Sequence, residues 1–252
     1  MATGNSSTRK LSLHERFSLM RRNLSFAQPI SALLAYPSQS LPTVESFSRR
    51  ITELQEHFPL LRCEVVNPKT RDPAFRLRPA LYAPEEILRQ ESYAPEAGED
   101  EKDRKEKILH NELKRMGSEG LSRPLWQVTL FTPSTLSESG TMSYLTLSAD
   151  HILLDGKGLA LLTHALLAPD ITSLPTETLE AIPLLEDTVN LRPSYAYLLP
   201  VVWQELIVPK MPSFLKPYVQ QPKPWPAGMD IQRSPSDSLC TQDRVKVTHR
   251  LP

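Results

Sequence analysis

Apolar residues recur three or four positions apart in three segments of the chain. This spacing predicts a helix over residues 13–24, another over 43–58 and a third over 157–168. Thr43 has the side chain of an N-cap residue, and Pro169 ends the third segment because proline cannot continue a helix. Each of the three helices is therefore expected to bury one face.

The first of these helices is amphipathic and basic. Its apolar stripe consists of Leu13, Phe17, Met20 and Leu24. Arg21 and Arg22 fall on the opposite side of the helix, which is expected to face water. A basic amphipathic helix can rest on a membrane surface, but few large apolar residues are available here for burial in lipid. The pattern therefore favours packing of the stripe on its own domain.

A fourth helix is expected over 96–117, where acidic and basic residues are mixed at helical spacing. Ion pairs between residues four apart are typical of a solvated helix. Its apolar stripe is limited to Ile108, Leu109, Leu113 and Met116. Because the acidic residues cancel the basic ones locally, this segment is a poor site for nucleic acid.

Five shorter segments have the pattern of β-strands, with apolar runs or apolar–polar alternation bounded by turn residues. They are 30–36, 60–66, 74–79, 124–131 and 141–150. The first is expected to be buried and to stop at Pro37. The last two are expected to be adjacent strands joined through a turn at 137–140. Strands and helices in this order indicate an α/β or α+β layered fold.

The composition of the chain changes after the third apolar helix. Half of the 24 prolines fall within residues 170–252. The stretch KPYVQQPKPWPAG (216–228) cannot be a packed helix or a central strand, since each proline lacks a backbone donor. We therefore divide the chain into a half-domain over 11–168 and a Pro-rich helix or crossover segment over 169–252.

Charge and cysteine content exclude several classes of partner. Lys plus Arg and Asp plus Glu are each 29, so no overall field attracts nucleic acid or anionic lipid. Cys63 and Cys240 form no CxxC pair, which argues against a disulfide framework or a zinc site and favours a reducing, cytoplasmic setting. No segment has the run of about 20 apolar residues that a membrane span needs, and the polar N-terminus is not a signal peptide.

The junction between the last predicted strand and the third helix carries candidate chemistry. In SADHILLDGKG (148–158), His151 is followed by three apolar residues, then by Asp155 and Gly156. An imidazole fixed at such a turn, with one nitrogen on an acceptor, can act as a general base near neutral pH. We expect Asp155 to tighten the turn through backbone amides or an arginine, and Gly156 to supply backbone freedom and space. This arrangement suits proton removal during acyl transfer.

Other chemistries lack their sequence patterns. No HxxH, HExxH or cysteine pair accompanies His151, so no metal site is expected, and the GxSxG and GxxxxGK[ST] patterns are absent. His164 lies inside the third helix and is expected to be a core or edge residue. The remaining histidines, which we expect at the surface, are His14, His57, His110 and His249.

The segment ADHILLDGKG resembles the HHxxxDG signature of the chloramphenicol acetyltransferase-like superfamily, which includes BAHD acyltransferases, peptide-synthetase condensation domains and fungal alcohol acetyltransferases. Three upstream segments are similar to the fungal alcohol acetyltransferase group in the same order. They are LHERFSLMRRNLSFAQPISALLAY, HFPLLRCEVV and SRPLWQVTLF. The resemblance covers residues 11–168 and implies a mixed sheet flanked by helices.

The resemblance implies a role for each residue of the signature. His151 matches the histidine that acts as general base on the acceptor, Asp155 the structural aspartate, and Gly156 the glycine that leaves room at the mouth of the tunnel. Acyl-CoA is implied as co-substrate and donor, and a small alcohol as acceptor; no permanently bound cofactor is expected, and no CoA-binding residue is identified. Any peripheral membrane contact is expected at the endoplasmic reticulum or lipid droplets.

The chain departs from the superfamily pattern in two ways. Asp150 replaces the first histidine of the signature, where a carboxylate can still make local hydrogen bonds at the active site. Superfamily members are built from two similar halves with the catalytic histidine in a tunnel between them, and this chain matches the N-terminal half. We therefore expect an incomplete acyltransferase that has little activity alone and needs a C-terminal half or self-association.

Two other functions remain open at this stage. One is a noncatalytic binding or interaction module derived from the same half-fold, which would offer an exposed face to a partner. The other is a condensation-type acyltransferase of secondary metabolism with a carrier-bound donor, although the sequence contains no carrier domain.

Overall fold

The computed structural model describes residues 7–26, 29–94, 99–134 and 142–172, together with 174, 176, 178–179, 181–188, 190, 194–212 and 214–215. The strands in this part of the chain are β1 (Thr8–Lys10), β2 (Ile30–Pro37), β3 (Cys63–Val66), β4 (Ala74–Leu77), β5 (Leu88–Tyr93), β6 (Trp126–Pro133) and β7 (Met142–Ala149). The α-helices are α1 (Leu13–Asn23), α2 (Val44–His57), α3 (Pro84–Ile87), α4 (Glu101–Ser118), α5 (Gly156–Leu167), α6 (Leu185–Thr188) and α7 (Tyr195–Val202).

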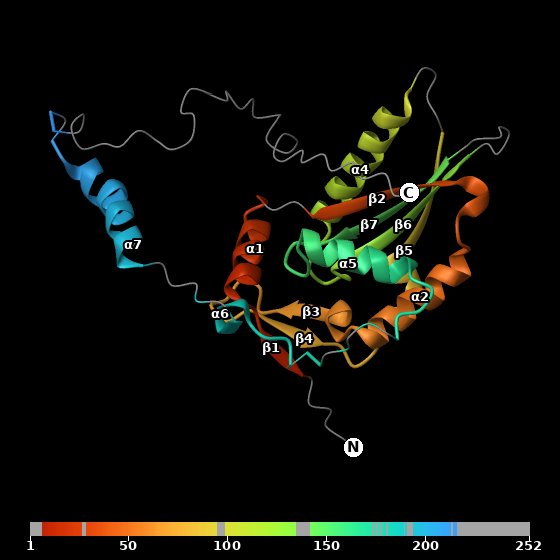
Figure 1. Ribbon diagram of the computed structural model, residues 1–252, viewed down its shortest axis with the longest axis horizontal. Coiled ribbons are helices and arrows are strands. Elements are labelled where there is room, and N and C mark those ends of the chain that lie inside the picture. The colour runs from red at the N-terminus through yellow and green to blue at the C-terminus, as the bar shows by residue number, and fades with distance from the viewer. Residues whose placement is uncertain are drawn as a thin grey trace. The chain divides into compact units, whose positions relative to one another are not determined.

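The larger sheet has the strand order β2-β7-β6-β5 (Figure 1). β7 pairs antiparallel with both β2 and β6, while β5 and β6 run parallel. A parallel pair needs a crossover, and α4 supplies it between β5 and β6. The sheet is therefore mixed, and β7, which leads into the His151 turn, is one of its two central strands.

Helices cover both faces of this sheet. Because side chains alternate along a strand, Leu145, Leu147 and Ala149 of β7 lie on one face, where they join a core cluster with the buried faces of α2 and α5. Figure 1 shows α2 and α5 on that side and α4 on the other. On the α4 side, Thr146 and Ser148 are fully buried, so this layer is partly polar.

A smaller sheet with the order β1-β4-β3 lies across the core from the larger one (Figure 1). Its inner positions include Phe75 and Val65, which pair across β4 and β3 and belong to the same core cluster. The expected strand over 60–66 begins only at Cys63. Residues Pro59–Arg62 form a 3-10 turn instead, since proline at the first position favours helical backbone.

Most predicted elements are confirmed, with corrections that have physical causes. Thr43 caps α2 by accepting from Ser46 N–H, as expected. β2 is half-buried and not buried, because it is the edge strand of the larger sheet. Strands β1 and β5 were not expected: β1 is only three residues long, and β5 (LRQESY) is mostly polar. The turn expected at 137–140 lies outside the described residues.

Helix α1 is a second correction, because its apolar stripe faces outward. Leu13, Phe17, Met20 and Leu24 are between 48% and 57% exposed. The residues that α1 buries are Ser18 and Leu19, and the Arg22 side chain is only 11% exposed. Hydrophobic pattern alone gives the wrong face of this helix.

The chain forms two compact units, Met1–Asn190 and Leu191–Pro252. Ile171 and Leu179 are buried in the core of the first unit, so this unit continues beyond α5. In the second unit, α7 continues into a π-helix at Trp203–Ile207 and a 3-10 turn at Val208–Lys210. None of the helices described is both long and apolar enough to cross a membrane.

Candidate active site around His151

The turn after β7 places His151 just beyond the C-terminal end of this central strand, between β7 and the N-terminus of α5. Ile152 and Leu153, the next two residues, are buried and anchor the turn in the core, as the sequence predicts. His151 itself is half-buried. Its backbone is therefore held by the packing of the turn, and its side chain is not enclosed by the core.

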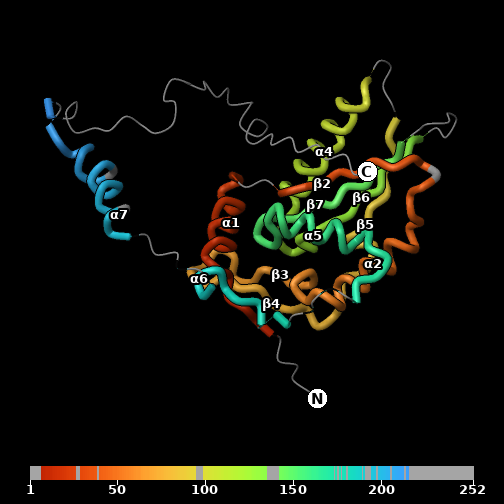
Figure 2. Tube along the Cα trace, in the orientation of Figure 1, coloured from red at the N-terminus to blue at the C-terminus, as the bar shows by residue number. Residues whose placement is uncertain are grey.

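Two features of the surroundings of the His151 ring bear on its chemistry. Its Nδ1 atom is buried and has no hydrogen-bond partner among the described residues, so the acceptor expected for one ring nitrogen is not found there. The ring of His14, from α1, lies with its centroid 6.0 Å from that of His151, and the two planes are inclined by 59°. Figure 2 shows α1 standing beside the segment that enters α5. His14 is exposed, as the sequence predicts, but its position beside His151 was not expected.

Asp150 points into the protein, where its carboxylate forms an ion pair and a backbone hydrogen bond. The residue is 3% exposed, and its Oδ2 lies 3.0 Å from Nη1 of Arg22. Its Oδ1 accepts the N–H of Ile152 at 3.0 Å. The expected local hydrogen bonds of this carboxylate are present, and an arginine from α1 has been added to them. An arginine, one of the two alternatives expected for Asp155, is found on Asp150.

Arg22 was expected on the water-facing side of α1 and is buried instead. Besides Asp150, its guanidinium donates to the carbonyl oxygens of Met116 and Glu119, at the C-terminal end of α4. A cation at that position also interacts favourably with the helix dipole of α4. A cavity of about 10 Å³ beside Arg22 and Asp150 has the size of about one water molecule. In the sequence, the signal for this buried cation is the carboxylate of Asp150, which stands where the signature has a histidine.

Asp155 acts on the backbone of the turn. It is the N-cap of α5, and its Oδ1 accepts the N–H of Gly158 at 2.7 Å. Its side chain is exposed and turned to the helix terminus. This is one of the two alternatives expected for Asp155, hydrogen bonding to backbone amides.

The two glycines that open α5 differ in their surroundings. A Cβ added to Gly156 would meet no heavy atom within 4 Å, so nothing in this unit requires glycine there for packing. A Cβ on Gly158 would lie 3.1 Å from Leu154 Cδ2 and 3.3 Å from Asp155 Oδ1. The space expected beside Gly156 is present, whereas the tight approach belongs to Gly158.

The other described histidines lie away from this turn. His164 is exposed on α5 and is not a core residue, since the helix buries Leu159, Leu162, Ala165 and Leu166. His57, expected at the surface, is half-buried, and its Nε2 lies 2.9 Å from the carbonyl oxygen of Leu174. His249 lies outside the described residues.

A groove of about 550 Å³ lies between the C-terminal half of α2 and the segment after α5. Its lining includes Arg49, Glu53, His57 and Asp170 but not His151. Arg50 also lines it, and its guanidinium is already bonded to the carbonyl oxygens after α5. The groove is shallow and ionic, without the apolar walls and convergent polar groups of a substrate pocket. We therefore place the candidate site at His151.

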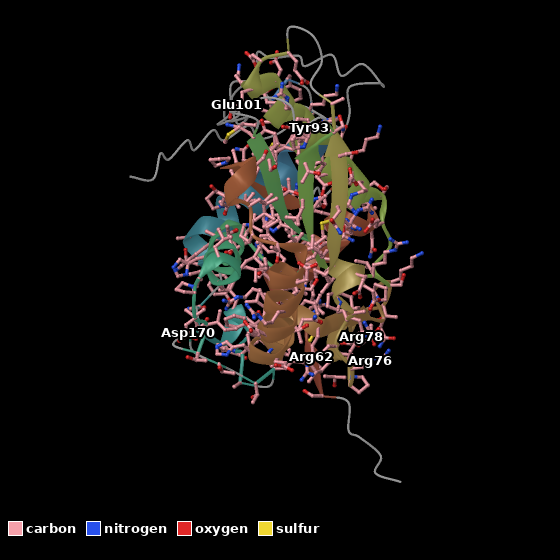
Figure 3. The ribbon with its side chains drawn as sticks, turned by 90° about the vertical axis from the view of Figure 1, so that its right-hand side faces the viewer. Arg62, Arg76, Arg78, Tyr93, Glu101 and Asp170 are labelled. Carbon is pink, nitrogen blue, oxygen red and sulfur yellow. The ribbon has the colours of Figure 1, made fainter. Side chains whose placement is uncertain are left out.

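Arginines also gather at the smaller sheet, where Figure 3 shows Arg62, Arg76 and Arg78 near one another in the first unit: Arg76 lies in β4, and Arg62 and Arg78 lie next to β3 and β4. Arg76 is paired with Glu64 at 2.7 Å. Arg78 lies over the ring of Tyr82, 3.9 Å from its centroid. Two of the three cations thus have partners, and the cluster is not an evident anion site. Nor do any three metal-binding side chains come together in the described part of the chain.

Comparison with known proteins gives a fold and no family. No protein-family model and no curated protein matches the sequence. Among solved structures, the tallysomycin biosynthesis protein TlmII matches with a TM-score of 0.51 and 19% identity, over 82% of this chain and 48% of its own. This likeness confirms the predicted fold class, a mixed α/β fold in which helices flank the sheet.

Two other matches are weaker. Trichothecene 15-O-acetyltransferase TRI3 from Fusarium sporotrichioides has a TM-score of 0.43 and 12% identity, over 66% of this chain and 35% of its own. A mutant starter condensation domain of rhizomide synthetase RzmA, solved in complex with C8-CoA, has a TM-score of 0.47 and 13% identity, over 64% and 34%. The chain thus spans less than half the length of each of these structures.

Proposed function

We propose that this chain carries the histidine-bearing half of an acyl-transfer site, in which an acyl group passes from acyl-CoA to an alcohol and His151 is the general base that takes the proton of the alcohol. The observation that carries the proposal is the placement of His151. It is half-buried on a turn that Ile152 and Leu153 anchor in the core, at the exit of a central strand, in a fold similar to that of TlmII. Because its backbone is held in place, the imidazole needs little rearrangement of the chain before it accepts a proton.

The reaction follows from the chemistry of a neutral imidazole. A ring nitrogen of His151 takes the proton of the alcohol hydroxyl as its oxygen attacks the thioester carbonyl. The tetrahedral intermediate then expels the CoA thiolate, which takes the proton back from the imidazolium, so that the products are an ester and free CoA. Asp155 and Gly156 do not touch the reacting atoms in this scheme: Asp155 caps α5, and Gly156 leaves open space beside the turn.

The outward-facing stripe of α1 supports the proposal that this half is completed by another surface. Four apolar side chains of α1, each about half exposed, lie on the helix that brings His14 next to His151. Exposed apolar surface of this kind marks a contact with another protein segment. The CoA channel and the groups that stabilise the oxyanion are accordingly assigned to that surface.

Ester formation tests this proposal. The protein is incubated at high concentration with acetyl-CoA and medium-chain alcohols, and the ester is measured by gas chromatography. We expect slow turnover that is lost in His151→Ala and kept in His164→Ala, a matched change of an exposed histidine on α5. Absence of ester above the buffer blank, or ester formation that survives His151→Ala, would contradict the proposal.

A second candidate function is favoured by the α1 stripe itself: a noncatalytic module that binds a partner through this face. In that case no ester is formed, and the protein self-associates or captures a partner. Gel filtration of the wild type and of Phe17→Ser/Met20→Ser, read together with the ester assay, distinguishes the two. Loss of association in the double variant, without ester formation by the wild type, supports the module. A clean monomer contradicts it.

A further inference from the structure

Helix α1 is held against the His151 turn by contacts that oppose its hydrophobic pattern. If apolar burial alone set its rotation, the stripe from Leu13 to Leu24 would face the core. Instead the helix buries Ser18, Leu19 and most of Arg22. Polar interactions therefore contribute to the observed setting. Of the two partly buried charged side chains of α1, Arg22 is 11% exposed, and Glu15, which pairs with Arg9, is 17% exposed.

We propose that the Arg22–Asp150 ion pair is a positioning device: it sets the rotation of α1 against the turn after β7 and thereby holds the rings of His14 and His151 side by side. Its consequence for acyl transfer rests on the function proposed above. Its consequence for the geometry of the two rings does not.

The ion pair is buried enough to act as a lock. Nη1 of Arg22 and Oδ2 of Asp150 are 3.0 Å apart, and the two side chains are 11% and 4% exposed. A buried charge that loses its partner remains desolvated and uncompensated, so rotations of α1 that separate the two groups are strongly disfavoured. The bonds from Arg22 to the carbonyl oxygens of Met116 and Glu119 add α4 to the same lock.

Asp150 transmits the lock to the backbone that carries His151. Its own N–H donates to the carbonyl oxygen of Leu125 at 2.7 Å, and its carbonyl oxygen accepts from Leu153 and Leu154. Its carboxylate also accepts the N–H of Ile152. The residue before His151 is thus fixed through its amide, its carbonyl and its side chain. The pair therefore joins α1 to a rigid turn.

The two contacts of α1 with the turn are well separated. His14 and Arg22 are eight residues apart, which corresponds to about 12 Å along an α-helix. Arg22 meets residue 150, and His14 approaches residue 151. The contact of Arg22 therefore limits the rotation of the same helix that carries His14. We therefore assign Arg22 as a positioning residue and His14 as the group that it places.

The test compares Arg22→Met, Asp150→Asn and the double variant. Asparagine keeps an acceptor for the Ile152 N–H and removes the charge. Each single variant should lower the midpoint of urea unfolding, since one buried charge stays unpaired. The double variant should recover most of this loss, because two neutral groups remain. Arg21→Met, at the exposed neighbouring position, is the matched control and should unfold like the wild type.

Positioning is read from the NMR signals of the His151 ring. In the wild type and in Arg21→Met, His14→Gln should shift these signals, because it removes a ring 6.0 Å away. In the stable double variant, the same change should leave them unmoved. If the double variant keeps the full response to His14→Gln, the ion pair does not set α1 and the inference is wrong. This measurement needs no turnover, so its failure is distinguishable from failure of the proposed reaction.

Discussion

Asp155 Oδ1 accepts the backbone N–H of Gly158 at 2.7 Å, and this bond caps the helix that follows the His151 turn. We predict that Asp155→Ala lowers the free energy of unfolding by about 1 kcal/mol, since an unpaired N–H is left at the first turn of α5. Asp155→Asn keeps the acceptor and should unfold almost like the wild type. Urea titration measures both. Equal stability of Asp155→Ala and the wild type would show that the cap is not formed.

The two glycines of the turn provide a matched pair. Gly156→Ala should be neutral or raise the free energy of unfolding by up to about 1 kcal/mol, because its Cβ enters open space at the start of a helix. Gly158→Ala should be destabilising, since its Cβ would approach Leu154 and Asp155 within 3.1 and 3.3 Å. Thermal unfolding compares the two. If the space beside Gly156 admits substrate, Gly156→Ala is also a stable variant with reduced ester formation.

Glu112 is a buried charged residue whose carboxylate is surrounded by hydrogen-bond donors. Its carboxylate is buried between α4 and the sheet, where Oε2 accepts from Thr129 Oγ1 at 2.9 Å and from Arg115 Nη2 at 2.7 Å. We predict that Glu112→Ala lowers the free energy of unfolding by about 1.5–3 kcal/mol, because the buried Thr129 hydroxyl loses its charged acceptor and Arg115 keeps only Glu119 as a carboxylate partner. Glu101→Ala, which breaks an exposed pair with Lys105 on the same helix, should cost less than about 1 kcal/mol. Similar losses for the two variants would contradict this account.

Tyr82 should make the free energy of unfolding depend on pH in the alkaline range. Burial raises the pKa of its hydroxyl above the ordinary 10.0, although Arg78 partly opposes the shift. Above pH 10 the unfolded chain ionises this tyrosine first, so the free energy of unfolding should fall as pH rises through that range. Tyr82→Phe should weaken this dependence. Urea unfolding between pH 8 and pH 11 tests it, and an unchanged slope in Tyr82→Phe would assign the effect to other groups.

Periodicity in the sequence is sufficient for the elements that bury an apolar face. α2 and α5 were expected within one or two residues of their ends because apolar spacing and capping residues agree. β5 was missed because its sequence, LRQESY, alternates little, and its place in the sheet depends on parallel pairing with β6. That pairing is a tertiary property which no local pattern contains.

The residues of the candidate site also divide into those that a local pattern predicts and those that only tertiary packing brings together. His151 and Asp155 belong to one local motif, so their proximity to the turn could be predicted from spacing. Arg22 and His14 reach the site from a helix more than 120 positions earlier, and only the packing of α1 brings them there. The hydrophobic pattern even pointed to the opposite face of α1, since a buried ion pair outweighs apolar periodicity at this position.

The most direct test of the central claim is chemical rescue of His151. Release of free thiol from acetyl-CoA in the presence of an alcohol is followed for the wild type and for His151→Gly, each with and without added imidazole. We predict that His151→Gly loses the alcohol-dependent rate by about 10²- to 10⁴-fold and that imidazole restores part of it, because the missing group is a base. An alcohol-dependent rate in His151→Gly equal to that of the wild type would contradict the assignment of His151 as the general base.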